Sequence, residues 1–320
     1  MSVDDGFNSL QSEADATIEA VREARRRRDA FRTALPTAAD VHKVVPSGSL
    51  ARGTHKDPIH DVDLVCVFHA SQHPSWGQPG TSAREALEHT RGLIKDKLGF
   101  NGTEGREVRR CDLRNHSVKC FLDDPNTPGA FTVDVTPALV HPDRGFLIPE
   151  QNRSKWIQSD PEHLIRMVAK RHEDWNQFAK LVRVLKRWNA DHGGHMKSLT
   201  VEVLALRHLP VGDRPNSIAR FFEAAAEAVW LPVEDPAGLC GEIQPDLDRL
   251  AASTALEAAA DAAAKAIDAA ARGQQQRAMC YWRTAFGAIF PEPPGGCNFS
   301  TVTKANERRP IEDSPQGCRG

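Results

Sequence analysis

The chain has 320 residues, of which 40% are hydrophobic and 26% are charged, and its formal net charge is −2 at pH 7. This composition is typical of a soluble globular protein with an apolar core, and the length predicts about two domains. The near-neutral charge argues against a nucleic-acid coat protein and against a polybasic membrane binder. Stable nucleic-acid binding is therefore not expected.

Seven cysteines are scattered along the chain: Cys66, Cys111, Cys120, Cys240, Cys280, Cys297 and Cys318. Their number is odd and no two have the CxxC spacing, so we expect neither a zinc ribbon nor a disulfide framework. The N-terminal stretch MSVDDGFNSLQSEAD is acidic and polar, unlike a signal peptide, and no window approaches the ~18 apolar residues of a membrane span. We therefore predict a reducing, cytoplasmic location without membrane contact.

The first half of the chain alternates between helical and extended patterns. In chain order we predict a helix at 8–34, strands at 41–45 and 61–68, a loop at 71–82, a helix at 83–98, and strands at 116–122 and 129–139. The apolar run DVDLVCVF makes 61–68 the clearest strand, and the turn residues of 123–129 predict a hairpin between the last two strands. This mixture predicts an α+β fold with a mixed sheet.

The second half of the chain has a helical pattern throughout. The predicted helices are 160–174, 175–191, 198–209, 216–230 and the alanine-rich stretch 251–272. The final residues lack periodicity and predict a flexible tail. We therefore divide the chain into an α+β lobe at 1–155, a helical lobe at 156–295 and a tail at 296–320.

Two aspartates stand at the head of the strand 61–68, where carboxylates are unfavourable. Because side chains alternate along a strand, Asp61 and Asp63 emerge on the same face and repel each other. The same alternation places Asp134 on one face of the later strand. If the two strands are neighbours, Asp134 completes a cluster of three carboxylates.

Three neighbouring carboxylates would be stabilised by Mg²⁺ or Mn²⁺, which take oxygen ligands and can also bind substrate phosphates. Two such ions about 4 Å apart can activate an attacking hydroxyl and stabilise a leaving pyrophosphate. Asp61, Asp63 and Asp134 are thus candidate metal ligands and catalytic residues. Gly48 and Ser49 offer a tight turn with a backbone amide and a hydroxyl, so they are candidate nucleotide-binding residues.

Each of these features alone has an ordinary structural explanation. An isolated Asp-x-Asp is usually a turn or a solvated strand edge, and most Gly-Ser pairs are turns. What indicates a function is the combination of a Gly-Ser turn, a short polar loop, Asp-x-Asp leading an apolar run, and an aspartate inside a later strand.

Basic and histidine-rich stretches carry less information. The arginine run 25–28 is usually a solvated helix face, and contact with nucleotide phosphates or an activating partner is the functional alternative. His42, His55, His60 and His69 cluster in the sequence, but their spacing does not resemble a zinc site.

The series Gly48-Ser49, Gly53-Thr54 and Asp61-Val62-Asp63-Leu64 resembles the signature of the polymerase-β-like nucleotidyltransferases. More narrowly, it resembles bacterial relatives of cyclic GMP–AMP synthase and oligoadenylate synthetase, which make second messengers in anti-phage signalling. The further matching stretches are VDVTPAL (133–139), FLIPEQNRSKWIQSDPEHL (146–164), LVRVLKRWNADHGGHMKSLTVEVL (181–204) and YWRTAFGAIFPEP (281–293). They resemble the third-aspartate strand, the link between two lobes, a helix-turn-helix and the final helix. One departure is His60, where many relatives carry serine.

The resemblance implies a role for each candidate residue. Asp61 and Asp63 would bind the metals and the triphosphate, while Asp134 would hold the catalytic ion and the acceptor hydroxyl. Lys186 would reach the donor triphosphate and Ser198 would hydrogen-bond to it. Without the resemblance, Lys186 could be a solvated helix lysine and Ser198 a helix N-cap.

The resemblance therefore implies a two-lobed nucleotidyltransferase that uses ribonucleoside triphosphates and Mg²⁺ or Mn²⁺ to make a cyclic di- or trinucleotide. Two alternatives stay open. An enzyme that extends an RNA end, such as a tRNA or poly(A) polymerase, is disfavoured by the near-neutral charge. A nucleotide-binding regulator without activity is disfavoured because all three aspartates are present.

The C-terminus suggests a regulatory partner. In some operons of this family, the synthase is joined through its C-terminal residue to target molecules by a ubiquitin-like ligation system. A flexible tail that ends in Gly320 would give such a system access, whereas an inert terminus is the simpler alternative.

Overall fold

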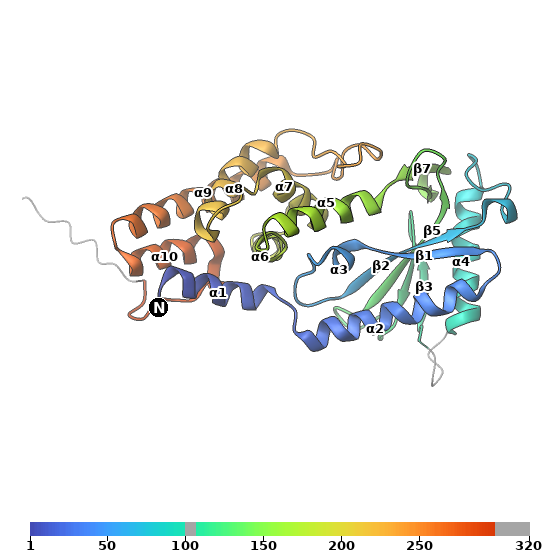
Figure 1. Ribbon diagram of the computed structural model, residues 1–320, viewed down its shortest axis with the longest axis horizontal. Coiled ribbons are helices and arrows are strands. Elements are labelled where there is room, and N and C mark those ends of the chain that lie inside the picture. The colour runs from blue at the N-terminus through green and yellow to red at the C-terminus, as the bar shows by residue number, and fades with distance from the viewer. Residues whose placement is uncertain (100–106, 298–320) are drawn as a thin grey trace, which may run out of the picture.

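A mixed β-sheet lies at one end of the elongated molecule and a bundle of helices lies at the other (Figure 1). The computed structural model describes residues 1–99 and 107–297. The predicted tail at 296–320, including Gly320, thus falls almost wholly outside the described residues.

The strands are β1 (Val41–Ser47), β2 (Asp61–Phe68), β3 (Arg110–Leu113), β4 (Val118–Phe121), β5 (Thr132–Val140), β6 (Phe146–Glu150) and β7 (Lys155–Ser159). They follow the order β1-β2-β5-β4-β3, and the hairpin of β6 and β7 extends from β5. β2 and β5 run parallel, whereas the other pairs are antiparallel. The predicted mixed sheet, the strand at 61–68 and the β4–β5 hairpin are confirmed.

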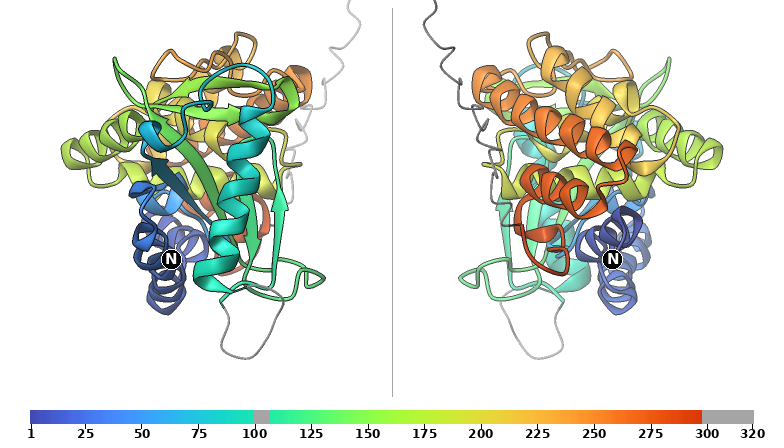
Figure 2. Two further views of the ribbon diagram at one scale, coloured as in Figure 1. Left: turned by 90° about the vertical axis from the view of Figure 1, so that its right-hand side faces the viewer. Right: turned by 90° about the vertical axis from the view of Figure 1, so that its left-hand side faces the viewer.

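Two helices, α2 (Ile18–Ala34) and α4 (Ser82–Leu98), pack on one face of this sheet (Figure 2). Alternate residues of β2 point into the core between sheet and helices, namely Val62, Leu64, Cys66 and Phe68. Because side chains alternate along a strand, Asp61 and Asp63 lie on the opposite face. That face is the one on which the predicted site must be built.

The helical part consists of α1 (Val3–Ala14), α5 (Pro161–Asp174), α6 (Phe178–Asp191), α7 (Ser198–His208), α8 (Arg214–Ala228), α9 (Arg249–Ala271) and α10 (Gln275–Phe286). Short 3₁₀ turns are η1 (Leu35–Thr37), η2 (Ala70–Gln72), η3 (Gln151–Arg153) and η4 (Gly287–Ile289). The core of this part is aromatic: Phe7 lies edge-on to Trp282, with ring centroids 4.9 Å apart, and Trp188 and Phe222 pack beside them. Alanines of α9 allow α8 and α10 to pack closely against it.

The N-terminal helix differs from its prediction, because the single helix expected at 8–34 is two helices. Thr17 caps α2 by accepting a hydrogen bond from the backbone N–H of Ala20, and Asp15 ends α1 in an extended conformation. α1 packs in the core of the helical part through Phe7 and Leu10. The division of the chain near residue 155 stays a prediction, but residues 3–14 pack with the second lobe.

Three strands lack a counterpart in the sequence prediction. β3 is short and half exposed, and β6 and β7 are short strands whose hairpin continues to Ser159, past the predicted lobe boundary at residue 155. The stretch 146–164, which resembles a link between lobes, therefore adds a hairpin to the sheet before α5 begins.

The cysteine prediction is wrong in one respect, because Cys280 and Cys297 form a disulfide with Cα atoms 5.5 Å apart. The chain after α10 turns back along the helix, where Gln276 donates a hydrogen bond to the carbonyl oxygen of Gly296. This return of the chain, which sequence spacing does not reveal, brings the two thiols together. Among the described residues we find no helix whose length and hydropathy would let it span a membrane.

Candidate active site

Two neighbouring strands bring the three predicted aspartates together. In the parallel pairing of β2 and β5, Asp63 is opposite Asp134 and Asp61 is opposite Thr132. Parallel strands in register keep the same alternation, so the three carboxylates share one face of the sheet. We call Asp61, Asp63 and Asp134 the carboxylate cluster.

The Gly-Ser turn lies directly against this cluster. β1 ends with Ser47 opposite Asp63, and the short helix α3 (Gly48–Arg52) begins at the next residue. Gly48 has a φ of +71°, and a Cβ atom at this position would lie 1.7 Å from Oδ2 of Asp63. Only glycine fits both the backbone conformation and the space. Gly48 and Ser49 are therefore placed beside the carboxylates, as the sequence predicts.

The carboxylate cluster is electrostatically unfavourable as it stands. Burial, together with the neighbouring charges of Asp61 and Asp134, raises the pKa of Asp63 to about 7. Burial also raises the pKa of Asp134, although the ammonium of Lys119 on β4 opposes this shift. Oδ1 of Asp134 is buried and, within the described part of the chain, has no hydrogen-bond partner.

These properties fit a divalent cation. A hard ion such as Mg²⁺ takes carboxylate oxygens as ligands and would neutralise the repulsion that raises the pKa of Asp63. The unpartnered oxygen of Asp134 is the donor that such an ion would use. The residues present thus suit the ion that the sequence predicts.

Lys186 and Ser198 come from the helical part, and their positions differ. The ammonium of Lys186 donates hydrogen bonds to the carboxylate of Glu202 at 2.5 Å and to the carbonyl oxygen of Thr54 at 3.1 Å. Its side chain is 2% exposed, so it is not the solvated lysine that the alternative explanation expects. Ser198 is exposed and is the first residue of α7, while Lys197 occupies the N-cap position.

Three further residues complete the surroundings of Lys186. Glu202 and Arg52 were not predicted from the sequence, and Thr54 belongs to the predicted signature but had no assigned role. Glu202 accepts hydrogen bonds from the guanidinium of Arg52 and, at 2.8 Å, from the hydroxyl of Thr54. Burial alone would raise the pKa of Glu202, but the charges of Lys186 and Arg52 hold it below its usual range. The available signal in the sequence was a charged residue, Glu202, inside the otherwise apolar stretch SLTVEVLAL. We call Arg52, Thr54, Lys186 and Glu202 the inter-lobe cluster.

The inter-lobe cluster fixes the segment that carries the Gly-Ser turn. Arg52 and Thr54 end this segment, whereas Lys186 lies on α6 and Glu202 on α7. One turn before Lys186 on α6, Arg183 donates a hydrogen bond to the carbonyl oxygen of Gly53 at 2.7 Å. Two helices of the second part therefore hold the turn over the carboxylates.

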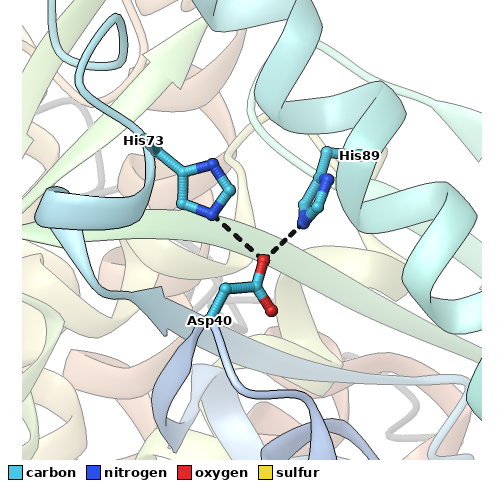
Figure 3. Close-up of side chains that lie close together, drawn as sticks. All are labelled: Asp40, His73 and His89. Atoms are coloured by element: carbon cyan, nitrogen blue, oxygen red, sulfur yellow. Dashed lines mark hydrogen bonds and ion pairs between the residues drawn. The ribbon is translucent and has the colours of Figure 1, made fainter.

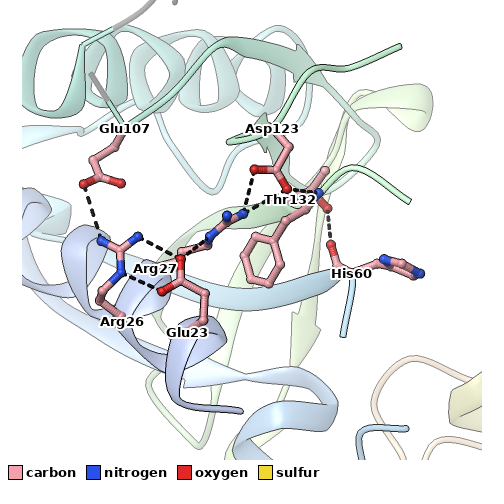
Figure 4. Close-up of polar contacts among 8 residues, drawn as sticks. Glu23, Arg26, Arg27, His60, Glu107, Asp123 and Thr132 are labelled. Atoms are coloured by element: carbon pink, nitrogen blue, oxygen red, sulfur yellow. Dashed lines mark hydrogen bonds and ion pairs between the residues drawn. The ribbon is translucent and has the colours of Figure 1, made fainter. Parts of the chain in front are cut away.

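The arginine run of α2 positions the strand that carries Asp134 (Figure 4). Arg27 forms an ion pair with Asp123 at 2.9 Å, and Asp123 accepts a hydrogen bond from the backbone N–H of Phe131. The next residue, Thr132, donates its N–H to the carbonyl oxygen of His60 at 2.8 Å. Arg26 and Arg27 both pair with Glu23, so these two arginines are engaged in ion pairs within the catalytic lobe.

A mixed sheet with three carboxylates on its parallel pair, a Gly-Ser turn beside them and a helical second part define a polymerase-β-like nucleotidyltransferase. Residues 1–171 match the family model described as "Second Messenger Oligonucleotide or Dinucleotide Synthetase domain". This match spans more than half of the chain, and the protein belongs to that family. The enzyme class predicted from the sequence is confirmed.

Two similar sequences are named as synthases of cyclic nucleotides. The chain is 25% identical over 283 residues to a cyclic AMP-AMP-AMP synthase of Escherichia coli (strain MS 115-1), covering 78% of this chain and 83% of the relative. It is 23% identical over 288 residues to a probable cyclic nucleotide synthase of Bacillus cereus (strain VD146), covering 78% and 82%.

Solved structures share the fold at low sequence identity. The structure of E. coli MS115-1 CdnC with ATP superposes with a TM-score of 0.70 at 16% identity, covering 91% of this chain and 99% of that chain. The complex of CdnC with HORMA-deltaN gives a TM-score of 0.65 at 16% identity, covering 89% and 96%. The fold of the described residues is thus that of CdnC.

Proposed function

We propose that this nucleotidyltransferase joins ribonucleoside triphosphates into a cyclic di- or trinucleotide and releases pyrophosphate, as a signalling enzyme of anti-phage defence. The observation that carries the proposal is the carboxylate cluster. Asp63 and Asp134 are in register, and the carboxylate of Asp63 lies so close to Gly48 that no side chain fits at that position. A nucleotide-binding regulator without activity would have no need to retain three carboxylates that repel one another.

We propose that Asp61, Asp63 and Asp134 hold Mg²⁺ or Mn²⁺, which when bound would neutralise the triphosphate and activate the attacking hydroxyl. Asp134 would also orient the acceptor hydroxyl and accept its proton. The hydroxyl oxygen then bonds to the α-phosphorus of the donor, while the bond from that phosphorus to the pyrophosphate oxygen breaks. Rate acceleration comes mainly from positioning and charge neutralisation.

The nucleotide-binding roles follow the same geometry. Gly48 and Ser49 would hold the β- and γ-phosphates, since their turn adjoins Asp63. Ser198 is exposed at the start of α7, one helical turn from Glu202 on the same helix face, and would hydrogen-bond to the donor triphosphate. Lys186 would contribute its positive charge to that site, and direct contact requires its ammonium to leave Glu202 and Thr54.

ATP is the first substrate to test, because the relative from E. coli is named a cyclic AMP-AMP-AMP synthase and CdnC was solved with ATP. The CdnC complex with HORMA-deltaN supports a protein regulator of this chain as well. Ligation through Gly320 remains a separate proposal. Deleting Gly320 should abolish conjugation in cells that carry the neighbouring operon, and unchanged conjugation would dismiss it.

The decisive experiment is an incubation of the purified chain with the four α-labelled ribonucleoside triphosphates and Mg²⁺ or Mn²⁺. After phosphatase treatment, chromatography should show a resistant small product. The product should be absent with Asp61→Asn/Asp63→Asn and present with Asp143→Asn, a matched change at an exposed aspartate outside the site. RNA is added to a parallel incubation. If this RNA is extended and no phosphatase-resistant small molecule forms, the proposal is contradicted and an RNA-end enzyme is favoured.

A further inference from the structure

Three side chains from separate segments converge at the other end of β2 from the active site (Figure 3). Asp40 immediately precedes β1, His73 lies in the loop that follows β2, and His89 lies on α4. β1 and β2 pair Val41 with Phe68, so this corner is about 17 Å along the strand from Asp63 at 3.3 Å per residue. The group is therefore separate from the carboxylate cluster.

Both imidazoles direct the same kind of atom to one carboxylate oxygen. Nε2 of His73 lies 3.0 Å from Oδ2 of Asp40, and Nε2 of His89 lies 2.7 Å from the same oxygen. One ligand atom from each residue can be chosen so that all three lie within 4.8 Å of one another. In a tetrahedral zinc site, ligands at about 2.0 Å from the metal are about 3.3 Å apart, so small shifts would bring the atoms to bonding positions.

The surroundings hold the two histidines in place. The ring of His73 stacks on Trp76, with centroids 3.8 Å apart, and Phe68 lies edge-on to both His73 and His89. The loop is also tied to the turn before β1, since His69 donates its backbone N–H to the carbonyl oxygen of Asp40 at 2.9 Å. His73 and Asp40 are largely buried, whereas the side chain of His89 is 42% exposed and leaves a route for an ion.

The chemistry of the three ligands selects the class of metal. Two imidazole nitrogens and one carboxylate oxygen suit Zn²⁺ and similar borderline ions, whereas Mg²⁺ prefers oxygen ligands alone. The same three atoms also form two hydrogen bonds without an ion, so the test has to distinguish a bound metal from a hydrogen-bonded cluster.

We propose that Asp40, His73 and His89 bind one Zn²⁺ ion, with a water molecule as the fourth ligand. This ion would fasten α4 and the loop after β2 to the start of β1. It would be a structural partner of the sheet, distinct from the Mg²⁺ or Mn²⁺ of the active site. The inference does not depend on the proposed function, because it concerns a different corner of the molecule.

The test is zinc binding by the full chain, purified without a histidine tag and stripped with a chelator. The Asp61→Asn/Asp63→Asn background removes binding at the active site. Equilibrium dialysis with elemental analysis should show one zinc per chain, and His89→Ala should weaken binding by at least about 100-fold. His42→Ala is the matched control, because it removes one ring of the neighbouring pair formed by His42 and His69.

Substitution with Co²⁺ supplies an independent readout. The wild-type chain should give the visible bands of a four-coordinate site without thiolate charge transfer, and His89→Ala should lose them. His73→Ala is a second variant that should lose the bands, and circular dichroism shows whether it still folds. If it does not fold, the result for His89→Ala, at the exposed ligand, is the test. Less than a tenth of an equivalent of zinc in the wild type, unchanged binding in His89→Ala, equal loss in His42→Ala, or thiolate bands would each overturn the proposal.

Discussion

The carboxylate cluster and the inter-lobe cluster lie beside the same segment, Gly48 to Thr54, but their charges are arranged in opposite ways. In the carboxylate cluster, three like charges face one another and Oδ1 of Asp134 has no partner among the described residues. In the inter-lobe cluster, the carboxylate of Glu202 is fully buried and accepts hydrogen bonds from Lys186, Thr54 and Arg52.

This difference distinguishes a cluster suited to binding a ligand from a cluster suited to positioning its neighbours. A buried charge without a partner lowers the stability of the fold. A protein with several such charges is therefore stabilised when a ligand of opposite charge binds. A buried charge with its partners satisfied holds its neighbours in one geometry, because removing any member leaves another unpaired. These properties support the proposal that the first cluster binds a cation and that the second keeps the Gly-Ser turn in place beside it.

The largest expected effect comes from a substitution in the carboxylate cluster, which should abolish activity and yet stabilise the metal-free protein. Asp63→Asn should lower product formation to below about one-thousandth of wild type, since several kcal/mol of metal-dependent stabilisation are lost. The same change should raise the melting temperature of the metal-free protein at pH 8, because it removes a repelled charge. Product assays and thermal melts of one preparation measure both. A lower melting temperature would show that Asp63 contributes to the fold.

The second cluster should respond in the opposite way. Glu202→Gln leaves the charges of Lys186 and Arg52 buried without compensation, and we expect a loss of about 3–5 kcal/mol in the free energy of unfolding. Activity should fall as well, because the turn at Gly53 and Thr54 loses its support. Urea unfolding measures the loss, and Glu223→Gln on the exposed face of α8 is the matched control. Equal stability of the two variants would refute the positioning role.

Two glycines at the ends of α3, Gly48 as its first residue and Gly53 as its C-cap, allow close contact to be distinguished from backbone strain. Gly48→Ala and Gly53→Ala both place a side chain at positive φ, +71° and +69°, which costs about 1 kcal/mol. At Gly53 the added Cβ atom has no heavy atom within 4 Å, whereas at Gly48 it collides with Asp63. Gly48→Ala should therefore cost at least about 2 kcal/mol and most of the activity. Equal losses in unfolding free energy would show that strain alone requires the glycine.

Local patterns in the sequence predicted how the candidate carboxylates are arranged on the sheet. The run DVDLVCVF predicted the bounds of β2, and alternation alone placed Asp61 and Asp63 together on one face. The structure shows that this face is the one away from α2 and α4. Both results follow from the two-residue period of a strand, which does not depend on distant contacts. The parallel pairing with β5 needed one further assumption, that the strands are neighbours, and the register of Asp63 with Asp134 confirms it.

Features that depend on distant contacts escaped the prediction. Glu202 contacts Arg52 across 150 positions of sequence, and no local pattern indicates that partner. α1 packs with α10 because Phe7 meets Trp282, although the sequence between α1 and α2 differs little from a continuous helix. The Asp40, His73 and His89 group likewise arises from three segments that only the folded sheet brings together.

The smallest expected effect is a pH dependence that the two clusters do not share. The pKa of Asp63 is raised to about 7, so the folded metal-free protein retains a proton that the unfolded chain releases near pH 4. The stability this contributes is fully present below about pH 4 and is lost as the pH rises through about 7. After allowance for solvent screening, we expect no more than about 2 kcal/mol. Because the charges of Asp61 and Asp134 contribute to the raised pKa of Asp63, the size of the change also depends on these two neighbours.

The comparison of wild type with Asp63→Asn isolates this contribution from all other carboxylates. Between pH 4 and 8, the wild type should lose stability relative to the variant, as measured by urea unfolding with a chelator present. Millimolar Mg²⁺ should flatten the difference, since the ion replaces the proton as the partner of the carboxylates. A difference that is independent of both pH and Mg²⁺ would mean that the cluster is not held as a repelled, cation-binding group.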